Sequence, residues 1–159
     1  MTNCRNLLLS FGGAVGLFLL FFCFGILWFG SVGAFIAYIN GQVVYLSPRM
    51  LDLGSHEAGV ETAAVFKMTN LSSKEVSVIG ERSSCGSCTF SEQIPIVAAS
   101  GKTVDLKINV LLPEYDTSYD QTITFLVAEP NRLAMYPVRI KATIPNPLPR
   151  PTEDQTSDE

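Results

Sequence analysis

The longest stretch of this chain without a charged residue runs from Leu7 to Ile39, and a single charge, Arg5, comes before it. A helix that crosses a bilayer needs about 20 apolar residues. The uncharged run has 33 residues, which as one straight helix would be about 50 Å long. Two spans do not fit in that length. We therefore expect one transmembrane helix in residues 7–39, lying within about 8–38, after a short N-terminal segment of residues 1–6.

The alternative for this run is a cleaved signal peptide, because Val32-Gly33-Ala34 has the small residues of a cleavage site. The apolar stretch is longer than that of a signal peptide, which favours an uncleaved anchor. Arg5 and the terminal amine precede the run, and the first positive charge after it is Arg49. Because positive charge stays on the cytoplasmic side, we expect a single-pass inner-membrane protein. Its N-terminus would be cytoplasmic and its C-terminal domain periplasmic or extracellular.

Glycine recurs through the uncharged run. Gly12 and Gly16 are four residues apart, and Gly30 and Gly33 each precede an alanine by four residues. Such spacing lets two membrane helices approach closely. Glycine is also common in membrane helices that do not associate. The four glycines are therefore candidate helix-packing residues for a weak homo-oligomer, in addition to the contact that the helix makes with the lipid bilayer.

The charge of the rest of the chain is close to balanced. Residues 40–144 hold nine Lys or Arg and eleven Asp or Glu, and the tail from Pro145 adds a net charge of −3. A protein that binds nucleic acid concentrates positive charge on one surface. We therefore expect no nucleic-acid partner.

Residues 40–144 show the period of two that is typical of β-strands with one buried face. In Thr103–Val110 and in Ala134–Ile144, apolar residues alternate with polar ones. Pro137 falls among the outward residues of the second run, which indicates an edge strand or a bulge. Turn residues separate these runs, and none has a helical period. About seven short strands predict an all-β fold, an Ig-like antiparallel β-sandwich. The other expected strands lie near 43–46, 64–69, 76–78 and 122–127.

The composition changes at residue 145. Four prolines alternate along the segment, and an acidic polar stretch ends the chain. Such a sequence cannot bury enough apolar surface to fold, so we expect residues 145–159 to form a disordered tail. The prolines can serve as a docking segment, but the composition favours a plain solubilising tail.

Cys85 and Cys88 form the one pattern with evident chemistry. Two thiols at this spacing can close a disulfide, exchange with another disulfide, supply half of a metal site or remain free. An oxidising compartment favours the disulfide. Zinc is disfavoured because a closed site needs four ligands and the chain has one histidine, whereas cuprous ion accepts fewer soft ligands. We expect no resident cofactor, no metal ligands beyond this pair, and no catalytic residues.

Several short motifs resemble a bacterial family of Ig-like domains of unknown function, related to the wider ASH/MSP/Hydin group. They are Asp52-Leu53-Gly54, Phe66 to Asn70, Ser84-Cys85-Gly86 with Cys88-Thr89, and Ser100-Gly101-Lys102. The resemblance covers about residues 46–144 and implies an exported or membrane-tethered β-sandwich without established catalysis. Two features depart from the family pattern. The chain has one extra residue between its cysteines, and it has Ser100 where the family often has proline.

Three functions follow as hypotheses. The first is a single-pass membrane-anchored Ig-like domain that serves as a protein-interaction or structural module at the extracytoplasmic membrane face. The second is a thiol-disulfide exchange or copper-handling domain that uses Cys85 and Cys88. The third is a passive subunit of an envelope complex, held by the glycine-rich helix.

Overall fold

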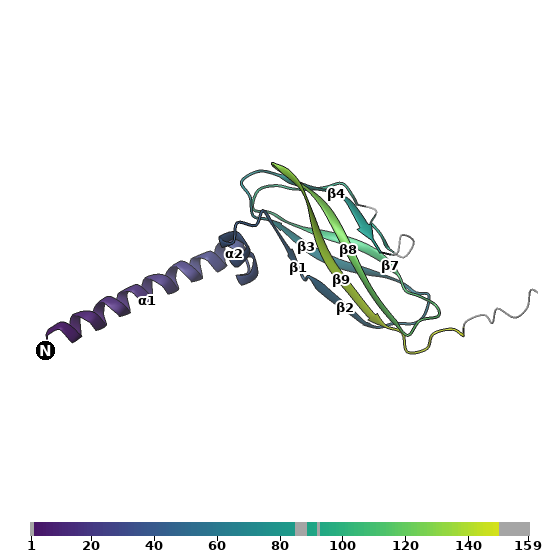
Figure 1. The fold of residues 1–159 in the computed structure, drawn as a ribbon, viewed down its shortest axis with the longest axis horizontal. Helices are drawn as coiled ribbons and strands as arrows, with labels where there is room; N and C mark the ends of the chain where they lie inside the picture. Colours follow the sequence, from purple (N-terminus) through teal and green to yellow (C-terminus); the bar gives the residue numbers. More distant parts are fainter. Residues whose placement is uncertain (1, 85–88, 92, 150–159) are drawn as a thin grey trace, which may run out of the picture.

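The computed structural model describes residues 2–84, 89–91 and 93–149. Two helices, α1 (Thr2–Phe29) and α2 (Val32–Ile39), precede a domain of β-strands. Figure 1 shows α1 extending away from this domain, with α2 between the two. The β-strands form two sheets that pack face to face, which is the two-layer arrangement of a β-sandwich.

The uncharged run forms two helices, so the expectation of a single helix within residues 8–38 is wrong. Gly30 has a positive φ of 72°, which ends α1 because a left-handed residue cannot continue a right-handed helix. Ser31 then caps α2, its side chain accepting a hydrogen bond from Ala34 N at 3.1 Å. Among the described residues, neither helix alone is long and apolar enough to cross a membrane. Val15–Leu27 and Val32–Ile39 reach that length together, across a bend of 107°.

The described residues form nine strands in two sheets, where about seven strands were expected. The four-stranded sheet has the order β1-β3-β7-β5 and the five-stranded sheet the order β2-β9-β8-β4-β6. The central strands of each sheet follow the order of an Ig domain, with β1, β3, β7 and β5 in one layer and β4, β8 and β9 in the other. The Ig-like sandwich is therefore confirmed, but the sheets are not wholly antiparallel as expected, because β2 pairs with β9 in parallel. The strands are β1 (Val44–Ser47), β2 (Met50–Ser55), β3 (Glu61–Asn70), β4 (Val76–Ser83), β5 (Thr89–Phe90), β6 (Ile96–Ala98), β7 (Thr103–Leu111), β8 (Ser118–Glu129) and β9 (Arg132–Thr143).

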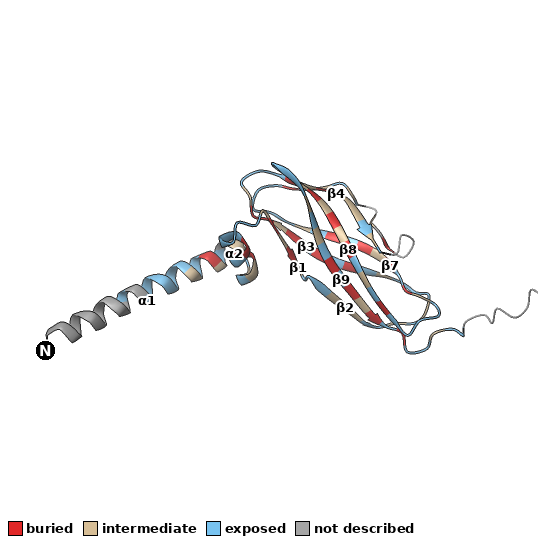
Figure 2. Cartoon of the chain, viewed as in Figure 1, coloured by how far each residue is buried: buried red, intermediate tan, exposed pale blue. Residues whose placement is uncertain are grey.

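The core lies between the sheets and consists of the residues that the alternation predicts to face inward. Figure 2 shows buried residues spaced along the long strands. At the centre, the rings of Phe66 from β3 and Phe125 from β8 meet edge to face with centroids 6.3 Å apart. Each such side chain contributes about 1.5–3 kcal/mol through burial. The other large, fully buried side chains are Met68, Leu106, Ile108, Leu112, Ile123, Ile140, Ile144, Val44, Val76 and Val78.

Pro137 lies where β9 has a neighbour on one side only. β9 is an inner strand, but its pairing with β2 begins at Arg139, whose N–H donates to Arg49 O at 2.9 Å. Backbone N–H groups two residues apart in a strand point the same way. The nitrogen of Pro137 therefore faces the side on which no described strand has yet begun. The edge-strand interpretation of this proline is correct locally, although β9 as a whole is not an edge.

The start of the predicted tail is held against the sandwich. Leu148 N donates to Glu114 O at 2.7 Å, in the loop between β7 and β8. The rest of the tail, residues 150–159, lies outside the described residues.

Asn70, at the end of β3, is a fully buried polar residue that joins three segments. Its Nδ2 donates to Lys74 O at 2.7 Å and to Ala98 O at 2.9 Å. Its Oδ1 accepts from the backbone N of Ser72 at 2.9 Å and from Ser72 Oγ at 2.7 Å. The amide thereby ties β3 to the β3–β4 turn and to β6. Buried polar groups of this kind are stable only when all their partners are present.

We expect Asn70→Ala to lower the free energy of unfolding by about 2–4 kcal/mol, because Ala98 O and the Ser72 N–H lose their partner and Lys74 O keeps only its bond from Ser72 Oγ. Asn70→Asp should cost at least as much, since a carboxylate cannot donate to Lys74 O or Ala98 O. Urea unfolding of the full chain in detergent micelles, followed by circular dichroism, measures both. Asn131→Ala, in the exposed β8–β9 turn, is the control and should stay within about 0.5 kcal/mol of wild type. A similar small effect at position 70 would contradict this role.

Two tyrosines, the buried Tyr119 and the partly buried Tyr136, differ in whether their hydroxyls have partners. Tyr119 in β8 is 4% exposed, and its hydroxyl has no hydrogen-bond partner among the described residues. Burial raises the pKa of Tyr119 to about 12. Tyr136 in β9 instead donates to the carboxylate of Glu129. Burial first, and then this bond, raise the pKa of Tyr136 well above its usual value.

The same substitution should therefore have opposite effects at the two sites. Tyr119→Phe removes a buried hydroxyl that has no partner, so we expect stability to be unchanged or higher by about 1 kcal/mol. Tyr136→Phe takes a donor from the buried Glu129 carboxylate, and we expect a loss of about 1–2 kcal/mol. Urea midpoints of the two variants in the same micelles give the comparison. Equal changes of the same sign would show that the two hydroxyls have equivalent environments.

Candidate interaction surface

Cys85 and Cys88, the candidate disulfide or redox pair, lie outside the described residues. The disulfide, exchange and copper hypotheses therefore stay predictions. Before these cysteines the described residues end at Ser84, whose hydroxyl donates to Gln121 Oε1 in β8. They resume at Thr89 in the other sheet. The strands before and after the two cysteines, β4 and β5, therefore belong to different layers of the sandwich.

The four candidate helix-packing glycines have different surroundings. Gly12 and Gly16 lie in α1, and a Cβ on Gly16 would meet nothing within 4 Å. Gly30 forms the break between the helices. Gly33 lies against the sandwich, because a Cβ there would overlap the phenol of Tyr45 in β1. Association between two copies through these glycines stays a prediction.

One further glycine is needed for packing and was missed as a candidate. A Cβ on Gly25 in α1 would overlap the ring of Phe35 in α2. That ring also contacts Phe21, Phe22 and Phe29 of α1, with centroids 5.7–6.1 Å apart. A glycine followed ten residues later by a phenylalanine has no helical period. The contact between Gly25 and Phe35 could be predicted only if the break between the helices at Gly30 were known.

The outer face of the five-stranded sheet carries an apolar patch, which we define as Ile79, Val97, Leu126, Leu133 and Met135. Four of these side chains are more than half exposed: Met135 is 67%, Val97 57%, Leu133 55% and Ile79 51% exposed. The five residues of the patch come from the neighbouring strands β9, β8, β4 and β6. Large apolar side chains that gather on one exposed surface indicate a binding site.

Strand register places these residues side by side. Met135 of β9 pairs with Leu126 of β8, which pairs with Gly80 of β4. A bulge at this point puts Ile79 and Gly80 together opposite Leu126. Because Gly80 has no side chain, Leu126 lies over its backbone, where a Cβ would be 3.4 Å from Leu126 Cδ1. In the next row, Leu133 pairs with Ala128, and Ala128 with Ser77. Ser77 then pairs with Val97 of β6.

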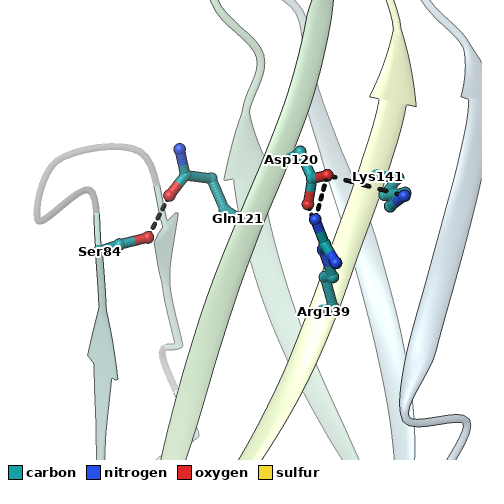
Figure 3. A network of polar contacts seen from close by, with 5 residues as sticks. All are labelled: Ser84, Asp120, Gln121, Arg139 and Lys141. Atoms are coloured by element: carbon teal, nitrogen blue, oxygen red, sulfur yellow. Dashed lines mark hydrogen bonds and ion pairs between the residues drawn. The ribbon is translucent and has the colours of Figure 1, made fainter.

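Charged residues occupy the other half of the same face. Asp120 of β8 receives two hydrogen bonds from Arg139 of β9, Nε to Oδ1 at 2.5 Å and Nη2 to Oδ2 at 2.6 Å. Lys141 Nζ lies 3.7 Å from Asp120 Oδ2. Figure 3 shows these three side chains together, beside the Ser84–Gln121 contact. The Arg139 guanidinium beside Asp120 holds the pKa of that carboxyl below its usual value. The outer face thus divides into an apolar half and a charged half.

The apolar patch lies at the end of the sandwich that is nearer α2. The start of β9, Arg132 to Tyr136, lines a cavity of about 500 Å³ together with Asn40, Gly41 and Gln42, which directly follow α2. At the β8–β9 turn, Arg132 Nε donates to Glu129 Oε2 at 2.7 Å. The side chain of Glu129 is 2% exposed.

The described residues contain no group of three or more His, Cys, Asp or Glu side chains that can hold a metal ion. The one histidine, His56, donates from Nε2 to Leu53 O at 2.9 Å. Its backbone N–H donates to Thr143 O at 3.0 Å. These bonds fix the loop after β2 against the end of β9.

Known structures resemble this fold at low sequence identity. A Vibrio cholerae protease, VesB, matches with a TM-score of 0.53 and 16% identity, over 71% of this chain and 36% of its own. A protein of unknown function from Porphyromonas gingivalis W83 matches with a TM-score of 0.52 and 17% identity, over 64% of this chain and 46% of its own. The Escherichia coli chaperone DraB matches with a TM-score of 0.51 and 8% identity, over 64% of this chain and 55% of its own.

This chain therefore spans about a third to a little over half of the length of these structures. No family model matches the chain. No curated protein matches it. The β-sandwich that the family resemblance implies is confirmed, and membership of that family stays a prediction. At these identities the likeness is one of fold, and the fold is that of an Ig-like β-sandwich.

Proposed function

We propose that this chain is a membrane-anchored Ig-like module that binds a protein partner through the outer face of its five-stranded sheet. The uncharged run Leu7–Ile39 anchors the chain in the inner membrane, and the sandwich lies on the extracytoplasmic side. The observation that carries the proposal is the apolar patch around Met135. A monomeric domain gains nothing from exposing four large apolar side chains on one sheet.

The energetics of the patch favour a protein as the occupant. Covering the exposed parts of Met135, Leu133, Val97 and Ile79 contributes about 1 kcal/mol for each side chain. That gain is too small for a stable complex without further contacts. The neighbouring Asp120, Arg139 and Lys141 can supply them, because interfaces combine an apolar centre with a polar rim.

The position of the patch restricts the partner. The patch is near the α2 end of the sandwich, so in an anchored chain it faces sideways, close above the membrane surface. A partner that reaches it is itself attached to the same membrane or lies flat on it. Weak self-association through the glycines of the anchor would bring a second sandwich to the same height.

The patch should be the site at which the chain cross-links to its partner. We expect the full chain, carrying a photoreactive residue in place of Met135, to give a discrete protein adduct in its own cell envelope. Adding Leu133→Lys should reduce that adduct several-fold without changing the urea midpoint, because both side chains are exposed. Gel analysis of the purified chain after irradiation makes the measurement.

A photoreactive residue in place of Leu111 is the matched control. Leu111 is 45% exposed and apolar, but it lies on the four-stranded sheet at the end away from α2. Adduct at both positions, or at neither, would contradict the assignment of the patch as the binding surface.

A further inference from the structure

A second apolar surface, on α2, is separate from the patch on the sheet. Its side chains on one stripe of the helix, Val32, Ile36 and Ile39, are 43%, 49% and 62% exposed. At 100° per residue these three positions lie within about 60° of one another around the helix. The stripe contains no polar atom, and the helix as a whole contains no charge.

The opposite side of α2 is packed against the sandwich. Ala34 and Ala37 are 1% and 5% exposed and form a small cluster with Leu71 of the β3–β4 turn. Gly33, which has no side chain, leaves space for the phenol of Tyr45 on the same side of the helix. Phe35 faces α1 instead, where it meets three phenylalanine rings. Two sides of α2 are therefore covered within the chain. The stripe of Val32, Ile36 and Ile39 is the open aliphatic side, and Tyr38, which is 51% exposed, lies beside Phe29 with ring centroids 4.7 Å apart.

The bend between the helices sets the direction in which the stripe lies. α2 turns by 107° from α1, so it runs nearly perpendicular to it. Figure 1 shows the sandwich and α1 on opposite sides of α2. The part of α1 from Leu7 to Phe29 carries no charge, and if this part enters the bilayer, α2 lies along the bilayer surface. The sandwich cannot follow α2 into hydrocarbon, because its charged side chains and open strand edges require water.

We propose that α2 is an interfacial helix, whose stripe of Val32, Ile36 and Ile39 enters the outer part of the bilayer while its other side holds the sandwich. This inference rests on the proposed membrane anchoring of the chain. The occupant of the stripe is lipid, because the stripe continues the uncharged surface of α1, where Leu17, Phe18 and Leu20 are 67–72% exposed. A helix of this kind fixes the orientation of the sandwich relative to the membrane.

A cation near the end of α2 complements this placement. Arg49 lines the cavity of about 500 Å³ that also contains Asn40, Gly41 and Gln42. Arg49 forms no ion pair within the described part of the chain, whereas Arg132 in the same cavity is paired with Glu129. A free guanidinium at the level of the lipid headgroups is attracted to their phosphates, by about 1 kcal/mol at an anionic surface.

The depth of α2 can be read from tryptophan fluorescence in the full chain reconstituted into phosphatidylcholine vesicles with brominated acyl chains. In a Trp28→Phe background, Ile36→Trp should emit at shorter wavelength than Leu111→Trp and should be quenched several-fold more strongly. Leu111 is a matched control because it is exposed, apolar and at the far end of the sandwich. Bromines near the headgroup end of the acyl chain should quench Ile36→Trp more than bromines near its terminal methyl.

Three results would overturn the inference, and flotation of the vesicles on a density gradient tells them apart. If the chain floats but Ile36→Trp is no more quenched than Leu111→Trp, α2 lies in water and only this inference fails. If the chain floats and deep bromines quench more strongly, α2 belongs to the membrane span. If the chain does not float with the vesicles, the proposed anchoring fails and the interfacial helix fails with it.

Discussion

The neighbouring residues Asn70 and Leu71 form the point on which the arrangement of helix and sandwich depends. Asn70 turns its amide inward and uses all four of its hydrogen bonds to hold β3, the β3–β4 turn and β6 together. Leu71 turns the other way and packs under Ala34 and Ala37 of α2. Its backbone N–H donates to Val43 O at 2.9 Å, just before β1 begins. One buried amide thus rigidifies the surface on which the helix lies.

A rigid junction between α2 and the sandwich lets the proposed anchor determine the orientation of the sandwich as well as its location. A sandwich on a flexible linker would present every face to a partner in turn. Here only Asn40 to Val43 separate α2 from β1, and Tyr45 of β1 fills the space beside Gly33. The orientation of the sheets therefore follows that of α2. The proposed binding surface and the proposed interfacial helix are coupled in this way, because the helix determines how high above the membrane the patch around Met135 lies.

The inward face of the sandwich was predictable from the sequence, whereas the two exposed apolar surfaces were not. Alternation identified Phe66, Met68 and Ile140 as core residues because burial of one strand face is a local pattern. The break at Gly30 and Ser31 was hidden, since a run without charges has the same composition whether it is straight or bent. Its local signal was the pair itself, a glycine that ends one helix and a serine that caps the next. The patch depends on the register of β9, β8, β4 and β6. The register between distant strands cannot be predicted from the sequence of any one strand.

The two apolar surfaces differ in what surrounds them, and that difference separates their occupants. The stripe on α2 borders residues without charge on its α1 side, and a surface of that kind is stable in hydrocarbon. The patch on the sheet lies between Asp120, Arg139 and Lys141 at one end and the Glu129–Arg132 pair at the other. Charges of both signs around an apolar centre would lose hydration in lipid without gaining partners, but they find complementary groups on a protein. The same chain can therefore present one apolar surface to the bilayer and the other to a protein, because charged residues border the patch on the sheet and none border the stripe on α2.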